Sequence, residues 1–381
     1  MRVILAVLAV GLLAWRPRST VVAFALAGMA GASVAVGASV GPAVRVVGPL
    51  IAFLGAALTL AGLVERSGLA ERAARTLAAA ARGSMAALYV AVCVLCAALT
   101  AAVSLDGAVV LMVPLVLVLS DRLGVAVRPL FLGVVAVANA FSIAVPQGNP
   151  TNLVLIGRLD LSPTAFVVHM FVPGLAAAML CAAAVALLER RSLAASYRSP
   201  PRQASPFSRA ERHAMFSLAG AALAAWVAPI VGIAPWWPFA AAVGLSVLVA
   251  AARPRLVVPW RIATQVAALV IVIGSLGLRA PAVPSGLLGL LVVVGVIAAS
   301  AAVANNLPAS VWAGALLAGP SGYAASIGLA IGPLATPQGS VATLIATDLA
   351  GDAAPRFPLR RFALISAGAL ITATLLLWAG L

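Results

Sequence analysis

The chain has 381 residues, of which 64% are hydrophobic and 9% are charged, and its formal net charge at pH 7 is +15. These values exclude an ordinary soluble domain, in which about half of the residues are apolar and about a quarter are charged. All basic residues apart from histidine are arginines, and the absence of lysine excludes a Walker A ATPase site, which needs a lysine beside its glycines. We therefore expect an integral membrane protein with no ATPase site and no nucleic-acid partner.

Apolar segments recur along the whole chain and do not alternate with polar residues. Continuous segments of this kind form membrane helices, whereas the strands of membrane barrels alternate. The expected ordinary spans are residues 3–15, 20–40, 48–64, 165–188, 213–229, 237–252, 263–278 and 362–379. Residues 65–82 carry Glu and Arg at helical spacing among alanines, which favours an interfacial helix.

Two longer apolar segments, 84–120 and 285–318, have polar interruptions. The first is interrupted at Ser104-Leu105-Asp106-Gly107 and the second at Asn305-Asn306-Leu307-Pro308. We expect both to be re-entrant hairpins whose polar tips reach the middle of the membrane.

A Pro-Gln-Gly string occurs twice, beginning at Pro146 and at Pro337, inside the apolar segments 129–156 and 324–350. Proline and glycine break a helix, and two matched breaks in one chain are typical of a secondary transporter with internal repeats. We expect an all-α polytopic membrane protein with two inverted repeats, each of about five transmembrane helices, one re-entrant hairpin and one broken helix.

The positions of the arginines give the expected topology, because cytoplasmic loops are enriched in basic residues. With the N-terminus outside, 20 of the 24 arginines fall in cytoplasmic loops. Both termini are then outside the inner or plasma membrane. The polar stretch 189–212 is expected to be cytoplasmic, which gives a first repeat at 1–190, a linker at 191–212 and a second repeat at 213–381.

Polar residues away from the loops concentrate at the interruptions and breaks, where freed backbone groups can also bind a ligand. The candidate residues for binding substrate or ion are Ser104, Asp106, Asn139, Gln147, Gly148, Asn149, Thr151, Asn152, Asn305, Asn306, Thr336, Gln338, Gly339, Ser340 and Thr343. The alternative is that they are proline kinks with amide side chains that hold helices together.

Asp106 is the acid placed most deeply in apolar sequence, where an ionisable group is costly and therefore suggests a function. It is expected to carry a coupling H+ or to coordinate Na+; alternatively it caps the second arm of its hairpin. No catalytic residue, metal site or cofactor is expected. The spacing of Cys93 and Cys96 suits redox or metal chemistry, but their apolar surroundings favour packing.

At these motifs the sequence resembles the arsenite efflux permease family, within the ion-transporter superfamily that includes citrate transporter-like domains, divalent-anion/sodium symporters and sodium/proton antiporters. The matching segments include 104–108, 148–153, 304–308, 314–316 and 331–344. The resemblance implies that the hairpin tips and broken-helix loops face each other and form the substrate and ion sites. The first tip has Leu105 where the family pattern has a polar residue, which argues against sodium coupling.

The leading functional hypothesis is therefore efflux of arsenite, antimonite or another small anion, coupled to the proton gradient or to an ATPase subunit. The alternatives are a sodium-coupled dicarboxylate or citrate-type symporter, a sodium/proton antiporter and, outside the transporters, a membrane scaffold or membrane-embedded enzyme. The expected partners are membrane lipid, the small substrate and a second copy of the chain in a homodimer.

Overall fold

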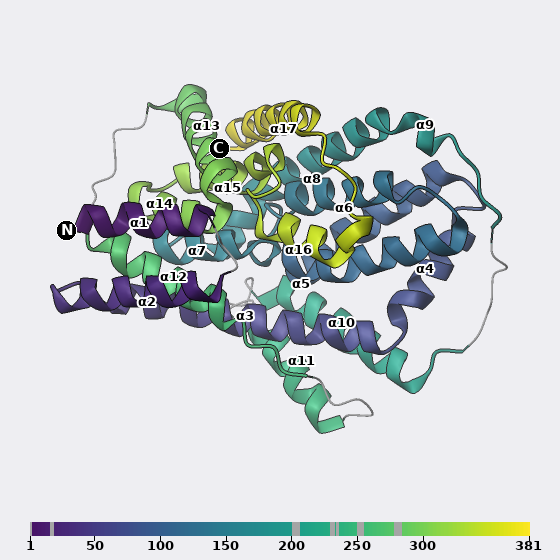
Figure 1. Cartoon of the computed structure of the whole chain (residues 1–381), viewed down its shortest axis with the longest axis horizontal. Coiled ribbons are helices and arrows are strands. Elements are labelled where there is room, and N and C mark those ends of the chain that lie inside the picture. The colour runs from purple at the N-terminus through teal and green to yellow at the C-terminus, as the bar shows by residue number, and fades with distance from the viewer. Residues whose placement is uncertain are drawn as a thin grey trace.

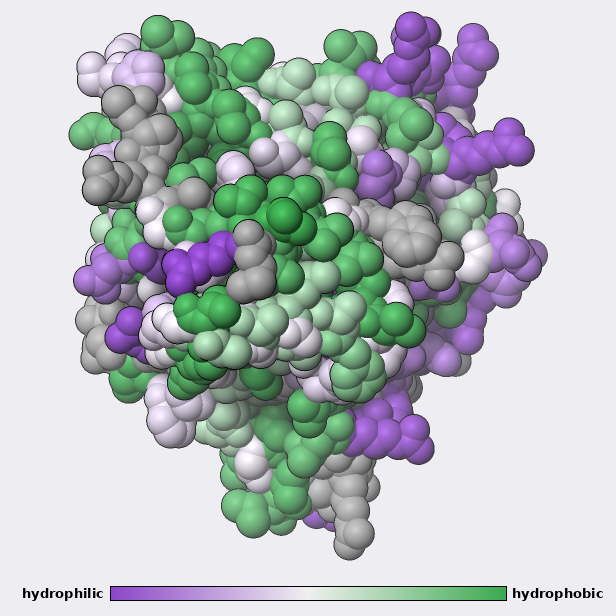
Figure 2. All heavy atoms as spheres, turned by 60° about the vertical axis from the view of Figure 1, so that its left-hand side comes forward, coloured by the Kyte–Doolittle hydropathy of each residue, from purple (hydrophilic) through white to green (hydrophobic). Residues whose placement is uncertain are grey.

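The computed structural model describes residues 2–15, 19–199, 206–228, 233, 236–249, 255–277 and 284–381. Throughout these ranges the regular structure is helical and there is no strand, which confirms the expected all-α class. Figure 2 shows hydrophobic residues over most of one face and hydrophilic residues gathered mainly at its right-hand edge. The linker residues 200–205 and the expected cytoplasmic or external arginines at 16, 18, 253 and 279 lie outside the described residues.

The first part of the chain contains the helices expected from its apolar pattern. They are α1 (Arg2–Trp15), α2 (Thr20–Ala35), α3 (Gly41–Arg66), α4 (Leu69–Ala80), α5 (Met85–Leu123), α6 (Val127–Phe141), the 3-10 turn η1 (Pro146–Gly148), α7 (Pro150–Leu159), α8 (Pro163–Leu188) and α9 (Arg190–Leu193). The expected interfacial helix at 65–82 corresponds to α4, and the expected broken helix at 129–156 corresponds to α6, η1 and α7.

The second part follows a related order. Its elements are α10 (Arg209–Val227), α11 (Trp236–Val249), α12 (Trp260–Gly274), α13 (Gly286–Ala304), α14 (Asn306–Leu316), α15 (Ser321–Ile331), the 3-10 turn η3 (Gly332–Ala335), α16 (Val341–Ala350), the 3-10 turn η4 (Gly351–Ala353) and α17 (Leu359–Gly380). The expected break in 324–350 is the stretch between α15 and α16.

Five of the described helices, α3, α5, α8, α13 and α17, are long and apolar enough to cross a membrane. The span expected at 20–40 is too long, because α2 ends at Ala35 and Gly37 follows with a φ of 92°. α1 has 14 residues, which is about 21 Å of helix against a hydrocarbon core of roughly 30 Å. The shorter apolar helices, such as α1 and α2, therefore need neighbouring elements to complete a membrane crossing.

Two hydrophobic clusters form the core, and each takes helices from both parts of the chain. One unites α5, α6 and α8 with α13, α15 and α17. The other unites α1 to α3 with α10 to α12, where Phe53 and Phe239 meet edge to face at 5.1 Å. The two expected repeats are thus interleaved in space.

The two half-helices that follow the breaks extend to different sides of the molecule. In Figure 1, α7 lies toward the side that holds the N-terminus, whereas α16 lies nearer to α4. Both begin in the interior, with Pro150 and Ala342 buried.

Candidate functional site

The first interrupted segment bends at Ser104, in the middle of the 39-residue element α5. Ser104 has a φ of 85° and a ψ of 165°, a conformation that non-glycine residues seldom adopt. The Ser104 Oγ accepts a hydrogen bond from the Gly107 amide at 3.4 Å, so this hydroxyl caps the second arm. Ser104 therefore provides a cap for the arm that follows it, and the alternative role of Asp106 as a cap stays a prediction.

The second interrupted segment breaks in the same way at Asn305, between α13 and α14. Asn305 has a φ of 81° and a ψ of 150°, and its Oδ1 accepts a hydrogen bond from the Leu307 amide at 3.2 Å. Two polar residues 201 positions apart thus hold matching backbone angles and each caps the helix that follows. The expected interruptions are confirmed, and the re-entrant path of the two arms stays a prediction.

The first broken-helix loop is folded around Ser142. The Asn152 Nδ2 donates to the Ser142 carbonyl at 2.8 Å, and the Asn149 Nδ2 donates to the Ser142 Oγ at 3.1 Å. A Cβ atom at Gly148 would lie 2.4 Å from the Ser142 carbonyl oxygen, so only glycine fits there. The Asn149 Oδ1 accepts from the Thr151 amide at 3.0 Å and caps α7.

The second broken-helix loop is bonded directly to the second tip. The Asn306 amide donates to the Gly339 carbonyl at 2.8 Å, and the Asn305 Nδ2 donates to the Gln338 carbonyl at the same distance. A Cβ atom at Gly339 would lie 2.8 Å from the Cα of Pro333, which again requires glycine. Ser340 precedes α16 without capping it through its side chain.

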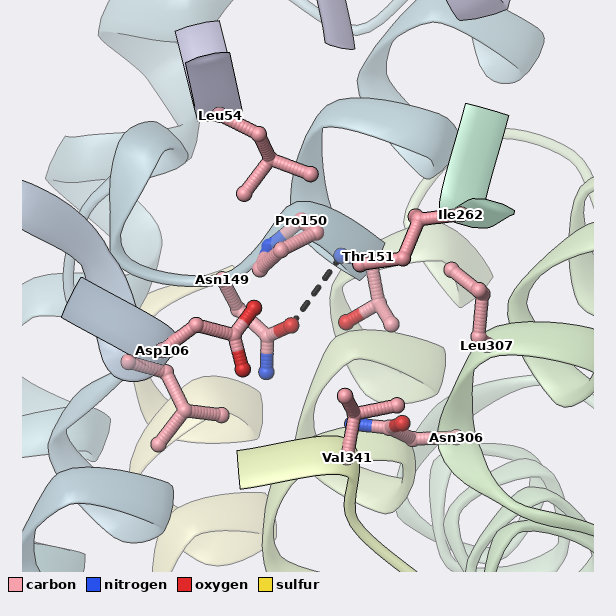
Figure 3. Close-up of a pocket in the computed structure, with 10 residues that line it drawn as sticks. Leu54, Asp106, Asn149, Pro150, Thr151, Ile262, Asn306, Leu307 and Val341 are labelled. Carbon is pink, nitrogen blue, oxygen red and sulfur yellow. Dashed lines mark hydrogen bonds between the residues drawn. The ribbon is translucent and has the colours of Figure 1, made fainter. Parts of the chain in front are cut away.

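Both tips, the first broken-helix loop and the first residue of α16 meet at one small pocket (Figure 3). Its polar lining comes from Asp106 of the first tip, Asn149 and Thr151 of the first loop, and Asn306 of the second tip, while Val341 follows the second loop. Figure 3 shows the Asp106 carboxylate directed toward the Asn149 side chain, with Thr151 and Asn306 across the pocket. The free space is about 10 Å³, room for about one water molecule.

Several buried polar atoms in this region have no hydrogen-bond partner. Seven such side-chain atoms occur among the described residues, and five belong to residues expected in the site: Asn139 Oδ1, Thr151 Oγ1, Asn152 Oδ1, Ser340 Oγ and Thr343 Oγ1. An unpaired buried polar group costs about 1–3 kcal/mol, so each calls for an explanation such as a bound water, ion or ligand. Thr151 is the one of these five residues that lines the pocket.

The sequence profile of the citrate transporter family (CitMHS) matches residues 7–326. The chain belongs to this citrate transporter family. Membership makes it a membrane transporter rather than an enzyme, in agreement with its long apolar helices. A comparison with curated proteins finds no match.

In this member of the citrate transporter family, the remaining candidate residues do not line the small pocket. Asn139 donates through its Nδ2 to the Val135 carbonyl of its own helix at 2.8 Å. Thr336 donates to the Ala302 carbonyl at 2.6 Å, and Gln338 is exposed. Ser104, Gln147, Gly148, Asn152, Asn305, Gly339, Ser340 and Thr343 are buried but do not line the small pocket.

Some residues of the site were not predicted from the sequence. Leu54 of α3 and Ile262 of α12 close the pocket, yet they are ordinary apolar helix residues with no distinguishing pattern. Ser142, which organises the first loop, could have been found as the polar residue closest before the first Pro-Gln-Gly string.

Proposed function

We propose that the protein is a secondary transporter of a small carboxylate anion of the citrate type, located in the inner or plasma membrane with both termini outside. The observation that carries this proposal is the pocket to which both tips, the first broken-helix loop and the start of α16 contribute. The family match supports the choice of a carboxylate substrate.

The pocket has chemistry suited to an anion and a coupling cation. α7 and α16 both begin beside it, through Pro150, Thr151 and Val341, and the N-terminal end of a helix favours negative charge. The Asp106 carboxylate supplies a group that can bind H+ or Na+ as the coupling ion. No further cofactor is part of this proposal.

Alternating access is proposed to arise from the two halves acting as inverted repeats. The matched backbone angles at Ser104 and Asn305, and the departure of α7 and α16 toward different sides, support that arrangement. A homodimer and an ATPase subunit stay predictions.

Efflux of arsenite or antimonite is the second candidate. What favours it is the resemblance of segments 148–153 and 331–344 to the arsenite efflux permease family. Sodium/proton antiport is the third candidate and has less support, because an antiporter would need a pair of acids in the membrane and, in the described part of the chain, Asp106 is the one acid that lines the pocket.

Uptake into everted membrane vesicles tests these candidates together. Labelled citrate, smaller dicarboxylates, arsenite and ²²Na+ are offered under imposed pH and sodium gradients. The proposal predicts gradient-dependent movement of a carboxylate that is absent from vesicles without the protein. Movement of arsenite or Na+ alone would contradict it.

A further inference from the structure

A second and much larger cavity adjoins the small pocket. Its volume is about 480 Å³, within the range of roughly 300–1,000 Å³ that is usual for small-molecule sites. Ile262, Leu307 and Val341 line both spaces, so these three apolar side chains separate one from the other. Figure 3 shows them around the far side of the pocket from Asp106.

The two volumes suggest different occupants. The small pocket has room for about one water molecule and therefore for a bare cation beside the Asp106 carboxylate. A six-carbon tricarboxylate does not fit there in this conformation, whereas it fits in the larger cavity.

The larger cavity also has the chemistry that a carboxylate needs. Arg261 is the one arginine among the described residues that line either space, and a guanidinium can bind a carboxylate through two parallel hydrogen bonds. Gln265, one helical turn further along α12, adds a buried amide, and Asp348 of α16 adds one acid. α12 begins at Trp260, so the positive end of its dipole lies at the same wall.

The larger cavity lies on the proposed cytoplasmic side. Its lining residues Leu13, Arg261 and Asp348 are each at or next to a loop that the arginine pattern assigns to the cytoplasm. On the proposed outer side the helices are in close contact, since a Cβ atom at Gly314 would lie 2.9 Å from the Cβ of Arg158. This arrangement corresponds to an inward-facing state.

We infer that the larger cavity is the cytoplasmic carboxylate site, with Arg261 as the residue that binds the substrate carboxylate, and that Ile262, Leu307 and Val341 separate it from an ion-sized pocket. The inference rests on the proposed carboxylate transport and names the site of substrate binding within it. The facing acid, Asp348, weakens the attraction for an anion, so its removal strengthens substrate binding.

Binding of labelled citrate to the purified full-length protein tests the inference, with KM for citrate measured from each side of the membrane. Arg261→Gln is expected to weaken citrate binding about tenfold or more, with partial recovery in Arg261→Lys. Asp348→Asn is expected to strengthen it. The matched control is Arg255→Gln, an exposed arginine of the same loop that lines neither cavity, and it should bind like the wild type.

Measuring the KM for citrate at each face of the membrane distinguishes a substrate-binding role of Arg261 from a structural role. In Arg261→Gln, KM should rise for citrate offered at the cytoplasmic face and change less for citrate offered outside. Unchanged citrate binding in Arg261→Gln, with a wild-type melting temperature, would overturn the inference and leave carboxylate transport intact. Wild-type protein that neither binds nor moves any carboxylate would overturn both.

Discussion

Gln147 and Thr336 make equivalent hydrogen bonds in the two halves of the protein. The Gln147 Nε2 donates to the Ala101 carbonyl at 3.2 Å, and the Thr336 Oγ1 donates to the Ala302 carbonyl at 2.6 Å. Ala101 lies three residues before Ser104, and Ala302 lies three residues before Asn305, the two residues with positive φ. Because the helix is interrupted there, its own backbone amides no longer donate hydrogen bonds to these carbonyls. Each broken-helix loop is thereby tied to the hairpin arm beside it.

Replacing Gln147 by methionine should destabilise the protein, because it removes the donor and leaves the buried Ala101 carbonyl without this bond. We expect a loss of about 1–3 kcal/mol, seen as a melting temperature several degrees lower, together with slower transport. Gln338→Met is the matched control from the second Pro-Gln-Gly string, and its exposed side chain should make that change nearly neutral. Equal effects of the two substitutions would contradict the assigned role of Gln147.

Gly148→Ala should disrupt the first loop. The added Cβ would lie 2.4 Å from the Ser142 carbonyl oxygen, a backbone atom that cannot move without moving the loop. Gly157→Ala in α7 is the control, because nothing lies within 4 Å of its Cβ position and alanine is the better helix former by about 1 kcal/mol. Thermal unfolding should show a lower midpoint for Gly148→Ala and an unchanged or higher one for Gly157→Ala.

Thr151→Val should separate function from stability. The Thr151 hydroxyl is buried without a partner, so its loss should leave the melting temperature unchanged or raise it, while substrate or ion affinity falls about fivefold or more. Thr100→Val is the comparison, since the Thr100 hydroxyl already donates to the Cys96 carbonyl at 2.8 Å and lines neither cavity. A Thr151→Val protein with wild-type transport kinetics would show that the hydroxyl is only part of a packed kink.

An ion pair between α4 and α10 should make stability depend on acid pH. The Arg72 guanidinium bonds to both Glu211 carboxylate oxygens, at 2.8 and 3.0 Å, and holds the pKa of Glu211 down to about 2 from an ordinary 4.5. Because the pKa is lower in the folded state, the stabilisation is complete above about pH 4.5 and is lost as the pH falls toward 2.

The melting temperature of the wild type should therefore fall more steeply over that pH range than that of Glu211→Gln. Glu71→Gln is the control, because Glu71 is largely exposed and its ion pairs are longer, at 3.4 and 3.7 Å. Parallel pH curves for the wild type and Glu211→Gln would contradict the prediction.

The sequence pattern was sufficient to predict the helices, the two interruptions and the two breaks. Glycine and proline fix these positions through steric rules that act locally, as at Gly148 and Pro146. Spatial arrangement was harder to predict, because the interleaving of α1 to α3 with α10 to α12 depends on side-chain packing between distant segments.

The candidate site was predicted in part. Asp106, Asn149, Thr151 and Asn306 do meet at one pocket, as their placement at breaks indicated. In the repeated Pro-Gln-Gly string, Gln147 corresponds to Gln338. In the structure, however, Thr336 makes the hydrogen bond in the second half that Gln147 makes in the first, so position in the string did not predict which residue makes this bond. Arg261 carries no motif, and its place beside the site follows only from the packing of α12.

Transport of labelled citrate by Asp106→Asn in proteoliposomes tests the central claim most directly, with Asn306→Ala measured in parallel. The claim is that the shared pocket couples carboxylate movement to a cation through Asp106. It predicts that Asp106→Asn still exchanges citrate across the membrane but no longer accumulates it under an imposed pH or sodium gradient, while Asn306→Ala loses both. Accumulation by Asp106→Asn with the full wild-type dependence on both gradients would contradict it.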